Sequence, residues 1–163
     1  MKRLTIAVLF VLFLHITACG DAEQQTTQTE NAASSENATE KKPELILDLK
    51  QISGKSLADV EAVLGKAEST EKVKGYPCEQ ADCQKALFKN GQFEIIFKSG
   101  NADRITISNI PNLTNNDNAI QVLGLPATKP SFKNPNNVIR YNDVENIGEI
   151  SFFTDYALIQ VTK

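Results

Sequence analysis

Two of the three cysteines in this 163-residue chain, Cys78 and Cys83, have a spacing that suggests specific chemistry. They are separated by four residues in a polar stretch, next to Pro77. This is not the C-x-x-C spacing of a redox pair, and no second ligand pair accompanies it, as a zinc site would require. In an oxidising compartment two such cysteines form a disulfide. We therefore predict a structural Cys78–Cys83 disulfide, with a metal site and a redox pair as the alternatives.

The residues that could perform acid–base catalysis give little indication of an active site. The only histidine is His15, inside an apolar N-terminal segment. Without another histidine the rest of the chain cannot build a Ser-His-Asp or Cys-His site, and it lacks the commonest ligand of transition metals. Two paired carboxylates remain the enzymatic alternative. The candidate carboxylates are Glu94, Asp103, Asp143, Glu145, Glu149 and Asp155. They fall at expected turns and strand exteriors, where charges are usually solvated, so we expect no enzyme, cofactor or metal site.

The third cysteine, Cys19, follows a cationic start and an apolar run over residues 4–16. This is the layout of a secretory signal, and the run is shorter than the ~20 residues that span a bilayer. An ordinary secretory cut after Ala18 requires a small residue two positions earlier, where the chain has the large, branched Ile16. The segment therefore favours a different kind of signal, while a soluble secreted product or a plain buried thiol remains the alternative.

The sequence Ile16-Thr17-Ala18-Cys19 resembles the lipobox of bacterial lipoproteins. That resemblance implies removal of residues 1–18 as a lipoprotein signal peptide, and a diacylglyceryl thioether with further acyl chains, such as palmitate, on Cys19. Several acyl chains hold a protein stably at a membrane. Gly20 follows the cysteine rather than an acidic residue, which favours the periplasmic face of the outer membrane over the inner membrane.

Residues 19–42 are rich in Gln, Thr, Glu, Asn, Ser and Ala and contain no aromatic or branched aliphatic residue. Such a segment cannot bury enough apolar surface to offset the entropy lost on ordering. We predict a lipidated, disordered tether with an r.m.s. span of ~25 Å, followed by a globular domain over residues 43–163.

The charge of the chain argues against two classes of partner. Removal of the signal would leave 15 Lys and Arg against 20 Asp and Glu. No basic patch is dense enough to indicate nucleic-acid binding. An anionic membrane surface would not attract this acidic domain either, so membrane attachment is expected through the lipid on Cys19 alone.

The first element expected in the domain is a short helix from Ser56 to Gly65. Ser56, with Asp59 three residues later, is typical of a helix start with a capping box, and Gly65 can adopt the left-handed conformation that ends a helix. Its apolar face would comprise Leu57, Val60, Val63 and Leu64. A helix of two turns does not persist alone in water, so it must pack on another element.

A three-stranded meander is expected next. After a long polar loop over residues 66–85, strands are predicted at 85–89, 92–98 and 103–108, and Asn90-Gly91 is a strong hairpin signal. The alternation would place Phe93, Ile95, Phe97, Ile105 and Ile107 on the inner face.

The same order recurs later in the chain. Residues 115–123 end in Leu123-Gly124, as the first helix ends in Leu64-Gly65. A polar loop follows, and strands are expected at 138–141, 148–153 and 157–162. We predict an α+β domain of two αβββ repeats, about 53–108 and 112–163, with short helices packed on one face of an antiparallel sheet of about six strands. Chance recurrence of common elements is the alternative.

The pattern Gly54-x-Ser56-x-x-x-Val60-x-x-x-Leu64-Gly65-x-Ala67 is similar to the opening signature of the SmpA/OmlA (BamE-like) lipoproteins. That family consists of small outer-membrane lipoproteins that support the machine inserting β-barrels. The duplicated layout resembles the tandem β-lactamase inhibitory protein, whose repeats carry disulfides. The chain departs from the BamE-like pattern in its duplication and its lack of tryptophan.

Two functional hypotheses follow, with catalysis as a third. We favour a non-enzymatic, membrane-anchored module that binds another envelope protein through the open face of the sheet or through a loop. The alternative is a proteinaceous inhibitor of a periplasmic or secreted hydrolase, with the Cys78–Cys83 loop and its Tyr76 and Pro77 as the inserted wedge.

Overall fold

A computed structural model describes residues 43–161, which belong to one compact unit. The predicted signal peptide (1–18), the tether (19–42) and Cys19 lie outside the described residues. In the described part no helix is long and apolar enough to cross a membrane.

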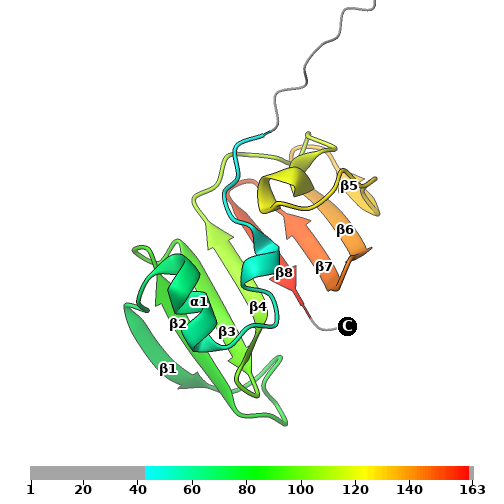
Figure 1. The fold of residues 1–163 in the computed structure, drawn as a ribbon. Coiled ribbons are helices and arrows are strands. Elements are labelled where there is room, and N and C mark those ends of the chain that lie inside the picture. Colours follow the sequence, from blue (N-terminus) through cyan, green and yellow to red (C-terminus); the bar gives the residue numbers. More distant parts are fainter. Residues whose placement is uncertain (1–42, 162–163) are drawn as a thin grey trace, which may run out of the picture. The chain divides into compact units, whose positions relative to one another are not determined.

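Eight strands form one antiparallel sheet, and one α-helix accompanies it, so the domain is α+β as predicted (Figure 1). The strands are β1 (Ser69–Val73), β2 (Cys83–Phe88), β3 (Phe93–Lys98), β4 (Asn101–Ser108), β5 (Phe132–Asn134), β6 (Val138–Val144), β7 (Ile147–Phe152) and β8 (Tyr156–Gln160). Their spatial order is β1-β2-β3-β4-β8-β7-β6-β5, which places four consecutive strands on each side of the β4–β8 contact.

The α-helix α1 (Leu57–Leu64) begins as its sequence predicts. The Ser56 side chain accepts a hydrogen bond from the Asp59 amide, and the Asp59 carboxylate accepts one from the Ser56 amide, which completes a capping box. These bonds satisfy amides that have no partner within the helix. Gly65 ends the helix with a φ of +90° but an extended ψ of 176°, so its conformation is not the expected left-handed helical one.

The predicted second helix is a five-residue 3-10 helix, η2 (Ala119–Leu123), and a further 3-10 turn, η1 (Leu49–Gln51), precedes α1. The Asn118 side chain makes no capping bond at the start of η2. Four of its five residues are buried, and Gln121 alone is polar and partly exposed, so the segment has too small a polar face for a surface helix. An amphipathic surface α-helix needs such a face, which explains the tighter, shorter turn.

The sheet has eight strands, whereas we predicted about six. The two additional strands, β1 and β5, fall in segments that we expected to be polar loops. Four of the five β1 residues and all three β5 residues are exposed. Both strands lie at sheet edges and are held by backbone pairing, β1 with β2 and β5 with β6. Strands without a buried face carry no hydrophobic alternation, so sequence patterns cannot detect them.

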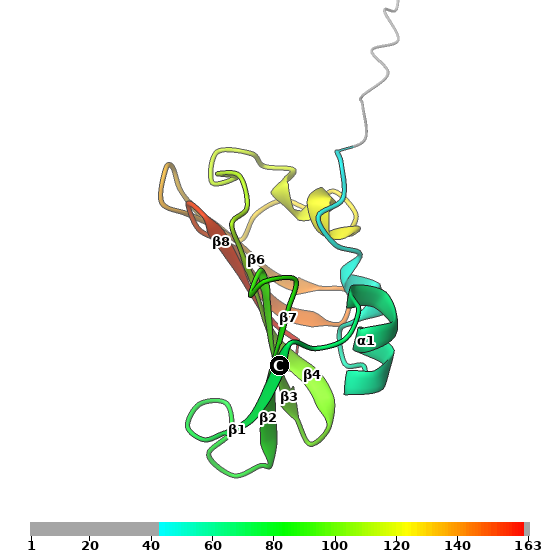
Figure 2. The ribbon, with the colours of Figure 1, turned by 90° about the vertical axis from the view of Figure 1, so that its left-hand side faces the viewer.

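The core lies on one side of the sheet. The alternating residues of β3 and β4 predicted to face inward are at most 2% exposed, and Ile105 pairs with Ile159 across the central contact between β4 and β8. Figure 2 shows the sheet close to edge-on, with α1, η1 (cyan) and η2 (yellow) drawn to the same side. Val60 and Leu64 of α1 are buried against this core, whereas Val63, expected on the same helical face, is 39% exposed.

Candidate functional site

The candidate site is the other side of the sheet, which we call the open face. Side chains alternate along a strand, so residues between the buried positions of β2, β3, β4, β6, β7 and β8 all point to this side. The open face is formed by Lys85, Leu87, Glu94, Ile96, Lys98, Arg104, Thr106, Arg140, Asn142, Glu149, Ser151, Leu158 and Gln160. Most of them are half-buried because neighbours in a flat sheet shield one another. Among them only Ser151 is fully buried.

On one flank of the open face, the basic residue of β2 forms ion pairs with acidic residues of β1 and β3. The Lys85 Nζ lies 2.6 Å from a Glu71 carboxylate oxygen and 3.7 Å from one of Glu94. The hydrogen bond with Glu71, with the charge of Glu94, raises the pKa of Lys85 above its usual value. This flank is therefore internally compensated.

The opposite flank is compensated in the same way on β6 and β7. The Arg140 Nε donates to the Ser151 hydroxyl at 2.9 Å, and that hydroxyl donates to the Glu149 carboxylate at 2.9 Å. The Arg140 Nε also lies 3.3 Å from the same carboxylate. The buried Ser151 hydroxyl thus has both a donor and an acceptor, and Arg140 has an anionic partner.

Arg104 lies between these two flanks, on the central strand β4, and has no such partner. Within residues 43–161 its guanidinium makes no ion pair, and its recorded contact is with the Tyr76 ring, whose centroid is 6.0 Å from the Arg104 Cζ. Across the sheet it pairs with Ile96 on β3 and Gln160 on β8, neither of which is charged. Arg104 is therefore a half-buried arginine on the open face whose guanidinium makes no hydrogen bond or ion pair within the described part of the chain.

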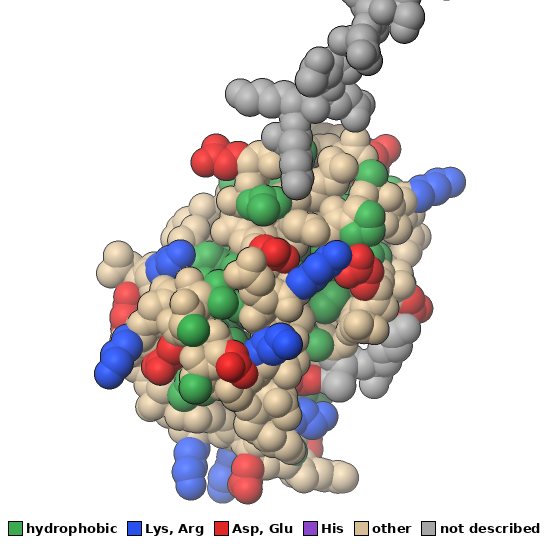
Figure 3. All heavy atoms as spheres, in the orientation of Figure 1, with side chains coloured by type: hydrophobic (Ala, Val, Ile, Leu, Met, Phe, Trp, Pro, Cys, Tyr) green, Lys and Arg blue, Asp and Glu red, His purple; other side chains and the backbone are tan. Residues whose placement is uncertain are grey.

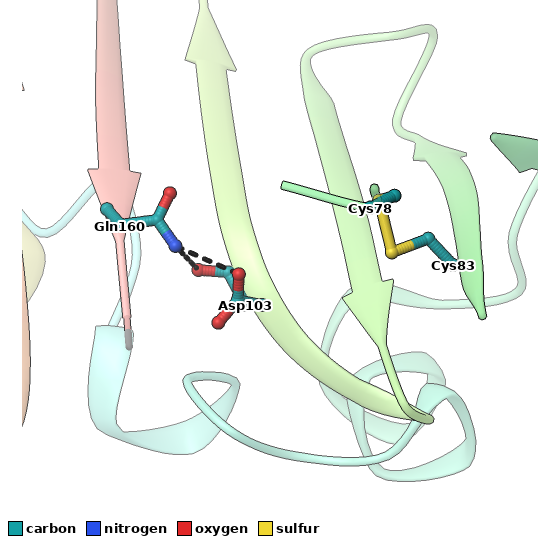
Figure 4. Close-up of a disulfide and its surroundings, with 4 residues drawn as sticks. All are labelled: Cys78, Cys83, Asp103 and Gln160. Atoms are coloured by element: carbon teal, nitrogen blue, oxygen red, sulfur yellow. Dashed lines mark hydrogen bonds between the residues drawn. A yellow bond between two sulfur atoms is a disulfide. The ribbon is translucent and has the colours of Figure 1, made fainter. Parts of the chain in front are cut away.

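The loop between β1 and β2, which carries Tyr76, also contains the predicted disulfide, so the Cys78–Cys83 prediction is confirmed. The two Cα atoms are 5.7 Å apart, and the side chains are 5% and 6% exposed. Cys83 is the first residue of β2 and Cys78 lies in the β1–β2 loop, so the bridge ties this loop to the sheet (Figure 4). Tyr76, two residues before the bridge, is 68% exposed.

Three exposed aromatic side chains flank the open face. Besides Tyr76, they are Tyr156 at the start of β8 and Phe132 on β5, which are 36% and 51% exposed. Phe132 pairs with Arg140, and the Tyr156 ring stacks on Phe153 with centroids 4.5 Å apart. The side of the molecule seen in Figure 3 instead has acidic and basic side chains interspersed with small apolar areas.

The candidate carboxylates do not meet in one site. Glu94 and Glu149 lie on β3 and β7, separated by two strands, and each is engaged by a basic residue. Asp103 is 5% exposed and accepts a 2.9 Å hydrogen bond from the Gln160 side chain, as Figure 4 shows. Glu145 pairs with Lys50 at 3.0 Å. The remaining two, Asp143 near the end of β6 and Asp155 at the β7–β8 turn, are exposed.

A hollow of about 400 Å³ lies where α1 meets the ends of β2 and β3. Leu57 and Phe97 contribute apolar walls, and Lys72 and Asp82 contribute one charge of each sign. One carboxylate cannot perform the paired acid–base chemistry that the enzymatic alternative requires. Among residues 43–161 no three His, Cys, Asp or Glu side chains are grouped as metal ligands would be.

Sequence reasoning identified Tyr76 as part of a candidate wedge but missed Arg104. The outward direction of Arg104 is readable, since it precedes Ile105 in a segment of strict alternation. That no acidic residue stands opposite it depends on strand register, which becomes fixed only in the folded sheet.

The chain matches no protein-family model, no curated protein and no solved structure. The likeness to lipobox, BamE-like and β-lactamase-inhibitory sequences therefore rests on the residues quoted above.

Proposed function

We propose that this protein is a bacterial lipoprotein, held at a membrane through acylated Cys19, whose domain over residues 43–163 binds another envelope protein. The open face is the proposed binding surface. The observation that carries this proposal is the placement of the three exposed aromatic side chains, Tyr76, Tyr156 and Phe132, around this one face with Arg104 and Arg140. Aromatic residues and arginine are enriched at protein–protein interfaces and supply most of their binding energy.

The polar character of the open face favours a reversible contact with another protein over an obligate one. Its ion pairs are half-exposed, and the apolar Leu87, Ile96 and Leu158 are scattered between charged rows. Obligate interfaces are more apolar and would leave a larger exposed hydrophobic surface when the partner is absent.

A photo-crosslinking amino acid, placed at one surface position at a time in the anchored protein in living cells, tests this proposal. Tyr156 on the open face and Val63 on α1 form a matched pair, because they are 36% and 39% exposed on opposite sides of the sheet. We expect a discrete crosslinked protein from position 156 and none from position 63. Crosslinks from position 63 alone, or from neither position, would remove the support for an open-face module.

The proposed anchor has its own test. Residues 1–18 would be removed and Cys19 would carry the acyl chains, with residues 19–42 as the tether and the periplasmic face of the outer membrane as the favoured location. Mass spectrometry of the mature protein should show the lipid mass on a peptide that begins at Cys19, and Cys19→Ser should release the domain from the membrane fraction. An unmodified thiol at Cys19 in the mature protein would refute the anchor.

We also propose that the domain arose by duplication, with repeats at about 53–108 and 112–163. The strand order reads the same from either edge toward the β4–β8 contact, and in each half a helical turn precedes four strands. Leu64-Gly65 and Leu123-Gly124 end the two helical turns. Each repeat then has four strands rather than the three expected, with short helices on one face, as in the BamE-like and β-lactamase-inhibitory folds that the sequence resembles.

A hydrolase inhibitor is the second candidate function, and the disulfide-closed loop favours it. Tyr76 is the most exposed of the large hydrophobic residues described, and its loop is tied to β2 by the Cys78–Cys83 bridge. A preorganised loop loses little entropy when it enters a cleft. Lysozyme-type and β-lactam-hydrolysing enzymes should then lose activity when micromolar domain is added. Unchanged rates with all of them would eliminate this candidate.

A further inference from the structure

Four of the six charged side chains of the open face form ion pairs. Lys85 is paired with Glu71 and Glu94 on one flank, and Arg140 is paired with Glu149 on the other. These pairs use the acidic side chains that β1, β3 and β7 present on this face. Near Arg104 there remains the Asp103 carboxylate, which reaches the side chain of Gln160, the residue opposite Arg104 on β8.

Two basic residues of the open face therefore make no ion pair with any residue from 43 to 161. They are Arg104 on β4 and Lys98 on β3, which lies on the same side of the sheet two positions beyond the Ile96 that pairs with Arg104. The nearest acidic residue in sequence, Asp103, holds the Gln160 amide and forms no ion pair with Arg104. Glu79, in the same loop as Tyr76, is exposed and forms none either.

The aromatic contact makes Arg104 more than an ordinary solvated cation. The Tyr76 ring lies over the guanidinium, and the disulfide two residues away restrains the loop that carries it. At 6.0 Å from the ring centroid the guanidinium is at the outer limit of a cation–π contact, which does not use its N–H donors. Those donors can bind a carboxylate in a bidentate manner.

We propose that the binding partner on the open face presents an Asp, Glu or chain-terminal carboxylate to Arg104, with Lys98 as a second cation and Tyr76 as an aromatic cover. This inference rests on the proposed function and adds the chemistry of the contact. A protein carboxylate is favoured over an anionic lipid surface, because the compensated flanks carry Glu71, Glu94 and Glu149, which would approach a membrane together with Arg104. A protein segment can meet the central cation alone.

The test combines charge reversal with the crosslinker at position 156. Arg104→Glu should reduce the crosslink yield at least tenfold, and Arg104→Gln should reduce it less, because glutamine is neutral and does not repel a carboxylate. Lys66→Glu, an exposed lysine just after α1, makes the same charge change away from the open face and should leave the yield unchanged. Thermal unfolding of each variant, compared with wild type, separates loss of binding from loss of fold.

The crosslinked peptide then supplies the direct probe. We expect Asp, Glu or a chain terminus close to the crosslinked site, and a synthetic peptide of that sequence should bind Arg104→Glu about 30-fold more weakly than wild type. Replacing that acid by Arg in the peptide should restore binding to Arg104→Glu but not to wild type. Tyr76→Ala, a change at a 68% exposed residue that should not affect folding, should also weaken binding to wild type.

The outcomes separate the two proposals. A crosslink at position 156 that persists with folded Arg104→Glu overturns the carboxylate contact and leaves the open-face module intact. A crosslinked peptide without an acidic group, or a charge swap that fails to restore binding, overturns it too. Absence of any crosslink from position 156 overturns both.

Discussion

Reducing the Cys78–Cys83 disulfide is the perturbation whose effect follows most directly from the structure. The bridge closes a ring with a sequence separation of only five residues. In the chain-entropy account, a ring this small restricts the unfolded state modestly, which corresponds to about 2 kcal/mol of stability. The sheet pairs β1 with β2 independently of the bridge, so the fold itself should survive reduction.

The assay is urea unfolding of the full chain carrying Cys19→Ser, followed by far-UV circular dichroism with and without reductant. A loss of about 2 kcal/mol should lower the unfolding midpoint by about 1 to 2 M urea at an unchanged slope. The double variant Cys78→Ala/Cys83→Ala should match the reduced protein to within about 1 kcal/mol. Its small excess would reflect packing lost at two nearly buried side chains.

A second readout links this stability to the candidate site. Tyr76 covers the Arg104 guanidinium at 6.0 Å, so the ring should shift the NMR resonance of the Arg104 side-chain N–H groups. Reduction should release the loop and move that resonance toward its position in Tyr76→Ala. Two results would refute the idea that the disulfide holds Tyr76 over Arg104. One is an unfolding midpoint that does not change with reductant, and the other is an Arg104 resonance that moves neither on reduction nor in Tyr76→Ala.

Three further predictions concern the fold. Burial raises the pKa of Tyr141 to about 12, so the protonated phenol stabilises the folded state fully below pH 10, and this contribution of about 2 kcal/mol should be lost as the pH rises to 12. In urea titrations between pH 10 and 12, Tyr141→Phe should therefore lose less stability than the wild type. An equal fall in the free energy of unfolding for the two proteins would contradict the assignment. Ser56→Ala should cost about 1 kcal/mol in the same titration because it removes the cap of α1, whereas an unchanged midpoint would mean that the capping box contributes nothing. Gly54→Ala and Gly124→Ala both place a side chain at a φ near +70°, but a Cβ at residue 124 would also lie 3.0 Å from the Asp48 carboxylate. Gly124→Ala should therefore lower the thermal unfolding midpoint more than Gly54→Ala does. Equal losses would show that the Asp48 side chain moves away from the added Cβ at no cost in stability.

The sequence determined the parts of the fold in which local chemistry and burial agree. α1 follows from the Ser56 cap and the apolar spacing, and its bounds match the prediction closely. The β3 and β4 strands follow from alternation that coincides with burial of Phe93, Ile95 and Ile105. The disulfide followed from cysteine spacing and number. In each case a side chain reports its own environment, so a pattern read along the chain is sufficient.

The sequence could not determine elements whose stability comes from neighbours distant in the chain. β1 and β5 have exposed side chains and exist because β2 and β6 offer backbone partners. The segment from Ala119 to Leu123 is apolar enough for a helix, but four of its five residues are buried and it forms a short 3-10 helix. Backbone pairing and burial around most of a segment leave no periodic signal in the sequence.

What the sequence by itself determined is therefore a list of outward and inward side chains, a helix start and a disulfide. Only the tertiary structure decided that Lys85 and Arg140 find carboxylates while Arg104 does not, and that Tyr76 reaches Arg104 from a loop 28 positions earlier in the chain. The physical reason is register: which residues face each other across paired strands, such as Arg104 and Gln160 at 56 positions apart (160 − 104), is set only when the strands pair. The charge left without an ionic partner on the open face is therefore a property of the assembled sheet.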